Sequence, residues 1–386
     1  MIDAGYSSLT YKGGNKYTGV TYNATSTSQI DFAGVEDLGG GMKADFFFES
    51  DINPTTQYNT GVQTLNGYTT AATGTVSATN GATQSNFSSA QAASTWGNGQ
   101  VKLGLSGAFG YVAFGAVNNA SLDFNQFSGP FGTAWGSGYG VTQGTVGNGY
   151  GSSAKVRYDN SVRYLTPELT TGLIGSLVYR NKNDVAANSI FSTSTGLQAL
   201  SGVQELALIY RNGPLNLIAV NQVDDGNGIA GAASAANTAA FTSQGATGFK
   251  YTTNSFGGNY TMGAATLYYG HQTMKNDATS SAVSNKTDRY AVKYAVTPVI
   301  NVMAAYNKLT AADGKTSTVT GLGADYMLSK MTALTFRMDR TTDDAGKLAS
   351  NQALGSTGIV GAGFAGGVTA SDAQRNRTAV GLRMAF

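Results

Sequence analysis

The sequence of 386 residues is poor in several kinds of residue. It contains no cysteine, so disulfides cannot stabilise the fold, although their absence still permits an oxidising location. Charged residues make up only 12% of the chain, about half the usual share of roughly 25%. The net charge is +2 and no basic run is present, so nothing indicates nucleic-acid binding.

Long hydrophobic runs are also missing. A transmembrane helix needs about 20 consecutive apolar residues, and the apolar runs here are of the size of LALIY. The other structure that crosses a bilayer is a closed β-barrel, in which every backbone N–H and C=O group is paired. The 21 tyrosines and 17 phenylalanines argue against a disordered chain.

What the chain does contain is alternation of apolar and polar residues, with the period of two that a β-strand requires. The pattern occurs in MKADFFFES (42–50), KVRYDNSVRYL (155–165), QELALIYR (204–211), RYAVKYAV (289–296), LTFRMDR (334–340) and the terminal RTAVGLRMAF (377–386). The second of these predicts Tyr158 on the apolar face and Arg157 on the polar one. Charges on the face opposite the apolar side chains favour a barrel with a wet lumen over a soluble β-sandwich with a dry core.

The connections between these segments alternate in length. Short joints are expected at 38–41, 107–110, 166–169, 212–215, 256–258, 297–298 and 328–330, and long loops at about 12–27, 51–98, 119–155, 181–201, 223–246, 271–286, 309–317 and 341–374. Short turns on one rim and long loops on the other are typical of an outer-membrane barrel. We therefore expect one all-β domain spanning residues 1–386, a transmembrane antiparallel β-barrel of sixteen strands.

Four blocks resemble the strand–turn–strand segments of trimeric general porins of the β-proteobacterial outer membrane, which belong to the Gram-negative porins. They are VEDLGGGMKADFFFES, LSGAFGYVAFG, YDNSVRYLTPEL and LGADYMLSKMTAL, spread over the whole chain. The resemblance implies a homotrimeric diffusion channel for small hydrophilic solutes and ions, located in the outer membrane of a Gram-negative bacterium. It also implies that the third long loop, about 119–155, folds into the lumen as a constriction.

The two ends of the chain fit this resemblance. MIDAGYSS resembles the middle of the first strand of the family, so a removed signal peptide and a few strand residues are expected before Met1. Phe386 is expected in the periplasmic aromatic girdle, and as a signal read by the barrel-assembly machinery. Outer-membrane lipid and lipopolysaccharide are the other partners that the family implies.

From Asn119 to Ala154 the constriction loop contains one charged residue, Asp123. In GPFG, Pro130 and Phe131 stand where the family usually has a carboxylate, and Ala116 stands where an arginine is usual. The remaining candidates for the pore wall are charged residues of both signs: Lys43, Lys102, Arg157, Arg163, Arg337, Arg377 and Arg383, facing Asp45, Glu49 and Asp159. With opposite charges alternating along the same strands, we expect a weakly ion-selective pore.

Other functions have less support. Outer-membrane hydrolases need a histidine with serine or aspartate partners, and the single His271 is expected where a strand runs out into a loop. We therefore predict no enzymatic activity, no metal site and no cofactor. Two alternatives stay open, a substrate-specific channel for sugars or organic anions and a structural or adhesive surface barrel.

Overall fold

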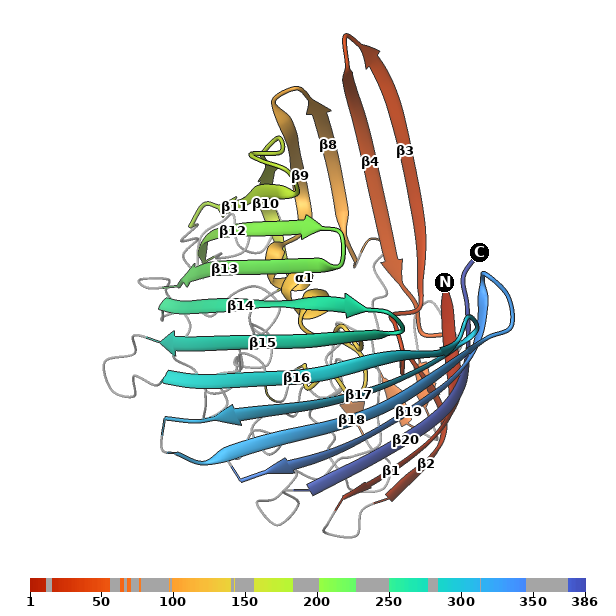
Figure 1. Cartoon of the computed structure of the whole chain (residues 1–386). Coiled ribbons are helices and arrows are strands. Elements are labelled where there is room, and N and C mark those ends of the chain that lie inside the picture. The colour runs from red at the N-terminus through yellow and green to blue at the C-terminus, as the bar shows by residue number, and fades with distance from the viewer. Residues whose placement is uncertain are drawn as a thin grey trace.

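The computed structural model describes residues 1–11, 16–55, 63–65, 68–70, 76–77, 97, 99–139, 142, 156–182, 201–226, 250–276, 284–312, 314–344 and 374–386. Seventeen strands within this part form one antiparallel sheet that curls around a concave face (Figure 1). They are β1 (Ile2–Tyr11), β2 (Lys16–Tyr22), β3 (Gln29–Gly39), β4 (Met42–Asp51), β8 (Val101–Gly107), β9 (Gly110–Asn118), β10 (Arg157–Leu165), β11 (Leu173–Arg180), β12 (Gly202–Asn212), β13 (Leu215–Asp225), β14 (Lys250–Met262), β15 (Ala265–Asn276), β16 (Ser284–Thr297), β17 (Ile300–Thr310), β18 (Thr316–Met327), β19 (Thr332–Asp343) and β20 (Gln374–Met384). The predicted antiparallel all-β architecture is confirmed.

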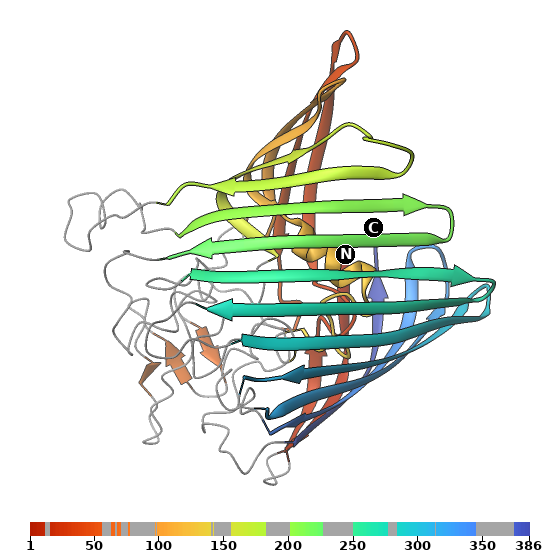
Figure 2. The same ribbon diagram turned by 60° about the vertical axis from the view of Figure 1, so that its left-hand side comes forward.

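Three shorter strands and one helix complete the described structure. The strands β5 (Gln63–Leu65), β6 (Tyr68–Thr70) and β7 (Val76–Ser77) form a separate small sheet within the expected second long loop. The helix α1 (Ala120–Phe127) opens the third long loop and lies inside the curved sheet (Figures 1 and 2). No helix in the described ranges is long and apolar enough to span a membrane.

The pairing order runs from β2 through β1 and β20 down to β9, and then through β8 and β4 to β3. Within the described part of the chain no ladder joins β2 to β3, so the sheet is open between these two strands. Met1, which precedes β1, and Gln29 of β3 exchange backbone hydrogen bonds of 2.8 and 2.9 Å. The hairpin β3–β4 projects beyond the rest of the sheet (Figure 1).

The sheet has seventeen strands where sixteen were expected, and the additional strand is β2. Its sequence KYTGVTY lies inside the expected first long loop and pairs in register with β1, from Ala4 opposite Tyr22 to Thr10 opposite Lys16. Aromatic and β-branched residues such as Tyr22 and Val20 favour the extended backbone. The loop therefore begins as a hairpin.

Most expected short joints are found as tight turns, but the one at 256–258 is wrong. Gly257 and Gly258 lie inside β14, and the turn to β15 is at Gly263 and Ala264, with φ of 59° at Gly263. Close neighbours account for the glycine at position 257: a Cβ there would lie 2.6 Å from the carbonyl oxygen of Tyr269 in β15 and 3.1 Å from the ring of Phe124 in α1. The missing side chain thus makes room for the helix.

Several strands are longer than expected at the long-loop rim. His271 was expected at the start of a long loop, but β15 continues to Asn276 and β16 begins at Ser284. His271 is therefore a strand residue. Its neighbours across the sheet are Phe256 and Asp288.

The alternation of inner and outer faces is clear in β12 and is interrupted in β10. Large apolar side chains face outward, as with Leu206 at 58% exposure, while the intervening Glu205 is fully buried on the inner face. In β10 a bulge shifts the register between Tyr158 and Ser161, with Asn160 at a φ of 51°. The extra residue turns Tyr158 to the inner face, where it is buried, so its expected position on the apolar face is wrong.

Candidate functional site: the constriction

The third loop crosses the interior of the sheet, as expected, and is fixed to the wall first at the N-terminus of α1. Asn119 caps the helix by accepting a hydrogen bond from the N–H of Leu122 (3.3 Å). The buried carboxylate of Glu205 on β12 accepts from the N–H of Ala120 and from the hydroxyl of Ser121, both at 2.7 Å. A carboxylate at a helix N-terminus is stabilised by the free N–H groups and by the helix dipole.

A second attachment is made by Arg289 of β16, which is buried beneath the loop. Its guanidinium donates to the side chains of Asn125 (3.1 Å) and Ser128 (2.7 Å), at the end of α1. It also donates to the carbonyl of Ser137 at 3.2 Å and to Asn307 of β17 at 3.1 Å. One arginine therefore ties the helix and the segment after it to the same two strands.

The third attachment is Asp339 of β19, which is fully buried. Its carboxylate accepts the N–H of Gly136 at 3.1 Å and the Nε–H of Arg377 at 2.9 Å. Arg375 lies 4.0 Å away on the same strand as Arg377. The negative charge of Asp339 thus offsets the positive charge of Arg377 and Arg375, and its hydrogen bond to Gly136 fixes the loop at this point.

Four aromatic side chains of the loop each face an arginine of the wall. The distance from the guanidinium carbon to the ring centroid is 5.9 Å for Arg289 and Phe124, 4.8 Å for Arg211 and Phe127, 5.8 Å for Arg337 and Phe131, and 4.4 Å for Arg377 and Trp135. Each contact has the geometry of a cation–π interaction, which contributes from about 0.5 to 2 kcal/mol. The aromatic edge of the loop is therefore turned to the wall and away from the open interior.

In the described part of the loop, the accessible positions are neutral apart from Asp123. Gln126 is exposed, and Leu122, Pro130 and Thr133 are half-buried. Asp123, the charged residue of this segment, is bonded to Arg163 of β10 at 2.9 Å. What the loop presents to the interior is therefore mostly neutral.

The structure brings most of the candidate wall charges together as pairs of opposite sign. Lys102 lies 3.1 Å from Asp45, and Arg157 lies 3.0 Å from Glu49. Tyr111 joins the first pair by donating to Asp45 at 3.1 Å. Arg337 and Arg377 pair with two carboxylates that were not among the expected site residues, Asp325 at 2.8 Å and Asp339.

Other candidates lie away from this region. Lys43 is opposite Asp37 beside the turn of the β3–β4 hairpin, and Arg383 is opposite Asp3 at the end of β20, so both are at the rim of short turns. Asp159 lies in the bulge of β10 and is half-buried. Alternation gives the face of a strand residue and not its height, which is why sequence alone grouped these residues with the rest.

Two residues that were predicted to line the constriction, Ala116 and Phe131, lie elsewhere. Ala116 pairs with Val101, and this pair lies on the same face as the outward-facing Leu103 and Phe114, so Ala116 does not take the place of a lumenal arginine. Phe131 is buried against Met303 and Ala305 of β17, so it packs on the wall and does not line the open interior. Of the two residues predicted at the tip of the loop, Pro130 and Phe131, only Pro130 remains a candidate for lining the open interior.

The residues that sequence reasoning missed are the three attachments, Glu205, Arg289 and Asp339. All three lie on the inner faces of alternating segments, and the pattern had shown this for Glu205 and Asp339. What it could not show is which wall residue meets which part of the loop. Those contacts join positions more than 80 apart, as in the bond from Glu205 to Ser121.

The comparisons with known proteins agree with this geometry. The chain belongs to the Gram-negative porin family, whose model matches residues 1–347. An outer membrane porin protein of Bordetella pertussis is 28% identical over 204 residues, covering 52% of this chain and 42% of that protein. The matched region thus spans less than half the length of that relative.

Solved structures with a similar fold cover almost the whole chain. The anion-selective porin from Comamonas acidovorans has a TM-score of 0.70 at 20% identity, covering 100% of this chain and 97% of that one. OmpF of Salmonella typhi in complex with daunomycin has a TM-score of 0.57 at 13% identity, covering 100% and 96%. At these identities the likeness shows the fold. The resemblance to porins seen in the sequence is confirmed, and the family is that of the Gram-negative outer membrane.

Proposed function

We propose that the whole chain, as one barrel domain, forms a water-filled general diffusion channel for small hydrophilic solutes and ions, with little preference for the sign of an ion. The observation that carries the proposal is the state of the charges at the constriction. In the described part of the loop the accessible positions are neutral apart from Asp123, which is paired with Arg163 of the wall. Other charges of the wall form pairs with each other, such as Lys102 with Asp45.

Such pairing supports weak selectivity for a physical reason. Strong selectivity needs a ring of charges of one sign in a narrow passage. Two opposite charges about 3 Å apart act as a dipole, and its field is screened beyond the Debye length of about 8 Å at physiological salt. An ion passing near Arg157 and Glu49 therefore meets a small net field.

The runner-up is a substrate-specific channel for sugars or organic anions. A sugar path needs aromatic rings that are open to the lumen, because sugars bind by stacking on ring faces. In the described part of the loop, Phe124, Phe127, Phe131 and Trp135 are all at most 5% exposed and face wall arginines. This arrangement favours general diffusion. We likewise propose no enzymatic role, because the family is one of channels.

We propose a homotrimer as the assembled form. The outward faces of the strands present large exposed apolar side chains, among them Leu103 and Phe114, which neighbouring subunits can cover. One solved structure with a similar fold is a trimer form of OmpT from Vibrio cholerae. Native mass spectrometry in a detergent that preserves porin trimers is expected to give three times the chain mass. A monomer mass would contradict the assembly but leave the channel proposal standing.

Liposome swelling tests the diffusion proposal directly. Vesicles containing the protein are placed in isotonic solutions of uncharged sugars of increasing mass. The swelling rate is expected to fall smoothly with solute size and to rise in proportion to solute concentration. Saturation of the rate by one sugar would favour the substrate-specific channel, and the absence of swelling with any solute would contradict both channel proposals.

A further inference from the structure

The inner face of β4 carries two carboxyl groups in succession at the long-loop end of the strand. Glu49 and Asp51 are two residues apart, so their side chains lie on the same face. In the neighbouring β3, Asp31 is opposite Glu49 and Gln29 is opposite Asp51. Glu49 is buried, Asp51 is half-buried and Asp31 is exposed. Three carboxyl groups therefore share a small part of the inner wall.

The basic residue that faces this group is Arg157 of β10. Its guanidinium donates one hydrogen bond to Glu49 at 3.0 Å and another to the side chain of Asn118 at 2.8 Å. Asn118 immediately precedes Asn119, the residue that caps α1 at the start of the constriction loop. The carboxyl groups of Glu49 and Asp51 thus stand beside the root of this loop, where ions from the long-loop side approach the constriction.

Asp51 lies beyond the part of β4 that faces the membrane. The outward face of β4 carries Phe46, which is 48% exposed, and then Phe48, which packs beside the exposed Phe32 of β3. Ser50 follows on the same face, so the apolar band of this strand ends at Phe48. Asp51 is three residues further along, about 10 Å at the usual rise of a strand. It therefore stands in the aqueous region, where the expected second long loop begins.

The surroundings of Asp51 favour its neutral form. Burial raises the pKa of Asp51 to about 6, and the negative charge of Glu49 and a hydrogen bond with its side chain act in the same direction. Asp31 adds to this rise, whereas Arg157 lowers the pKa. A carboxyl group beside a carboxylate holds its proton more strongly, because two like charges so close together repel each other. Asp51 is therefore neutral below pH 6 and charged above it.

The wall beside the loop root gains one negative charge when this proton leaves. The charges of Glu49 and Arg157 sum to zero at either pH. With Asp51 included, the sum is zero while Asp51 is protonated and −1 once it is ionised. An ion approaching the constriction therefore meets a different field on the two sides of pH 6.

We propose that Asp51 is a specificity-determining residue of the pore, which makes ion selectivity depend on pH. The ionised carboxylate attracts cations and repels anions at the approach to the constriction, and the protonated carboxyl group does neither. This role rests on the channel function proposed above. A unit charge about 10 Å from an ion in water, screened by salt, changes the ratio of anion to cation permeability by roughly 1.5-fold.

The test is the zero-current potential of single channels in a fixed KCl gradient, recorded between about pH 5 and about pH 8. In the original protein the ratio of chloride to potassium permeability is expected to fall by roughly 1.5-fold as the pH rises, with a midpoint near 6. Asp51→Asn is expected to abolish this step. Asp344→Asn, an exposed aspartate at the same rim, is the matched control and is expected to keep it. Absence of the step in the original protein, or its survival in Asp51→Asn, would overturn the proposal.

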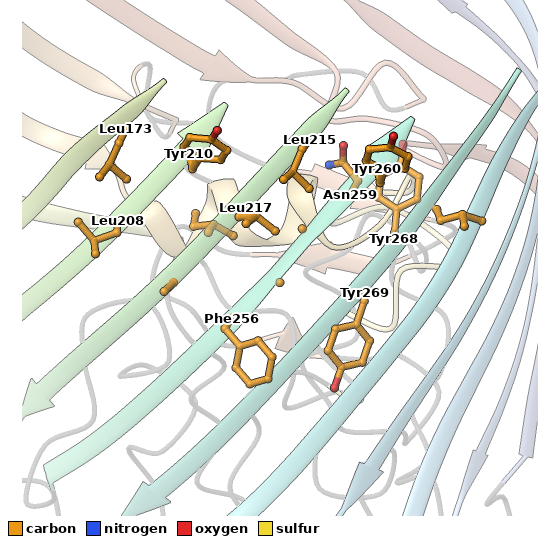
Figure 3. A pocket seen from close by; sticks show the side chains of 15 residues that line it. Leu173, Leu208, Tyr210, Leu215, Leu217, Phe256, Asn259, Tyr260, Tyr268 and Tyr269 are labelled. Atoms are coloured by element: carbon orange, nitrogen blue, oxygen red, sulfur yellow. The ribbon is translucent and has the colours of Figure 1, made fainter. Parts of the chain in front are cut away.

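Histidine is the residue type that ordinarily titrates in this range, so the single histidine, His271, requires its own control. His271 lies on the outward face of β15, with its ring 5.2 Å from that of the exposed Phe256. Its neighbours Phe256 and Tyr269 line an apolar groove on this outer surface (Figure 3). Because His271 faces away from the lumen, His271→Gln is expected to keep the step. Loss of the step in this variant would assign it to His271 and contradict the role of Asp51.

Two further measurements separate this role from the channel function. Glu49→Gln is expected to move the step to lower pH, because it removes the negative charge that favours protonation of Asp51. A step at the original pH would contradict the coupling of the two carboxyl groups. Infrared spectroscopy, which needs no conduction, is expected to show one protonated carboxyl group fewer in Asp51→Asn than in the original protein at pH 5. A conducting pore whose selectivity does not vary with pH would contradict the role of Asp51 alone, whereas absence of conductance would contradict the channel.

Discussion

Trp135 of the constriction loop lies over Arg377 of β20, with 4.4 Å between the guanidinium carbon and the ring centroid. Both side chains are buried, and Arg377 also pairs with Asp339, which holds the N–H of Gly136 next to Trp135. The loop and the far wall are therefore joined by one compact group of ring, cation and carboxylate. Its loss should change both the width of the pore and its stability.

Replacing Trp135 with alanine is expected to widen the constriction and to make it more variable. The variant loses the cation–π contact and leaves a cavity against the wall, and large-to-small changes of this kind cost about 3–5 kcal/mol. Single-channel recording should show higher mean conductance and more current noise than the original protein. Gln126→Ala, an exposed position on the same loop, is the control. Equal noise in the two variants would show that Trp135 does not hold the loop.

Replacing Asp339 with asparagine is expected to destabilise the barrel and to favour anions. Removing one member of a buried ion pair costs about 3–5 kcal/mol, because the remaining charge is left uncompensated. Arg377 and Arg375 would then carry unbalanced positive charge beside the loop. Thermal unfolding followed by circular dichroism should show a lower midpoint. If the Asp339→Asn variant kept both the unfolding midpoint and the ion selectivity of the original protein, the role of Asp339 in stabilising the barrel and neutralising the arginines would be contradicted.

Replacing Asp123 with asparagine is expected to shift selectivity modestly toward anions and to leave stability nearly unchanged. The ion pair with Arg163 is partly exposed, and such pairs contribute only about 0–1 kcal/mol. Its removal leaves the charge of Arg163 facing the interior. The zero-current potential should move toward anions by less than in the Asp339 variant. An unchanged potential would show that the pair of Asp123 and Arg163 does not reach the ion path.

Replacing Phe386 with aspartate is expected to lower the yield of assembled barrel strongly. Phe386 is 71% exposed at the end of the outward apolar face that includes Val380 and Leu382. A charge near the membrane interface costs only about 0–1 kcal/mol in a folded barrel, so a large loss would indicate a failure of insertion. Ala312→Asp, at an exposed turn on the opposite rim, is the matched control. Outer-membrane levels equal to those of the control would contradict this role.

Local patterns were sufficient to predict much of the fold. In β12 Glu205 and Arg211 lie on the face opposite Leu206 and Leu208, and in β19 Arg337 and Asp339 alternate with apolar residues, so the inner and outer faces of these strands could be predicted from the sequence. The pattern failed where the backbone departs from regular geometry. The bulge at Asn160 reversed the face of Tyr158, and the pair Gly257 and Gly258 read as a turn although it lies within β14.

The site was less predictable than the fold, because its geometry depends on contacts between distant segments. The sequence identified the constriction loop and its single acidic residue, Asp123. It gave no means of pairing Phe131 with the wall, or of linking Arg289 to Ser128 across the interior. A face follows from a period of two residues, whereas a contact across a barrel depends on strand tilt and height.

The most direct test of the channel account is the zero-current potential of single channels in a planar bilayer, measured across a tenfold KCl gradient. Most wall charges are paired, as in Lys102 with Asp45, and Asp123 of the loop is paired with Arg163, whereas Arg289 has no carboxylate partner among the described residues. We therefore predict a potential close to zero, with a small preference for anions. A potential near the ideal limit of about 59 mV for either ion would contradict the account. It would mean that unpaired charges of one sign line the narrowest part of the pore.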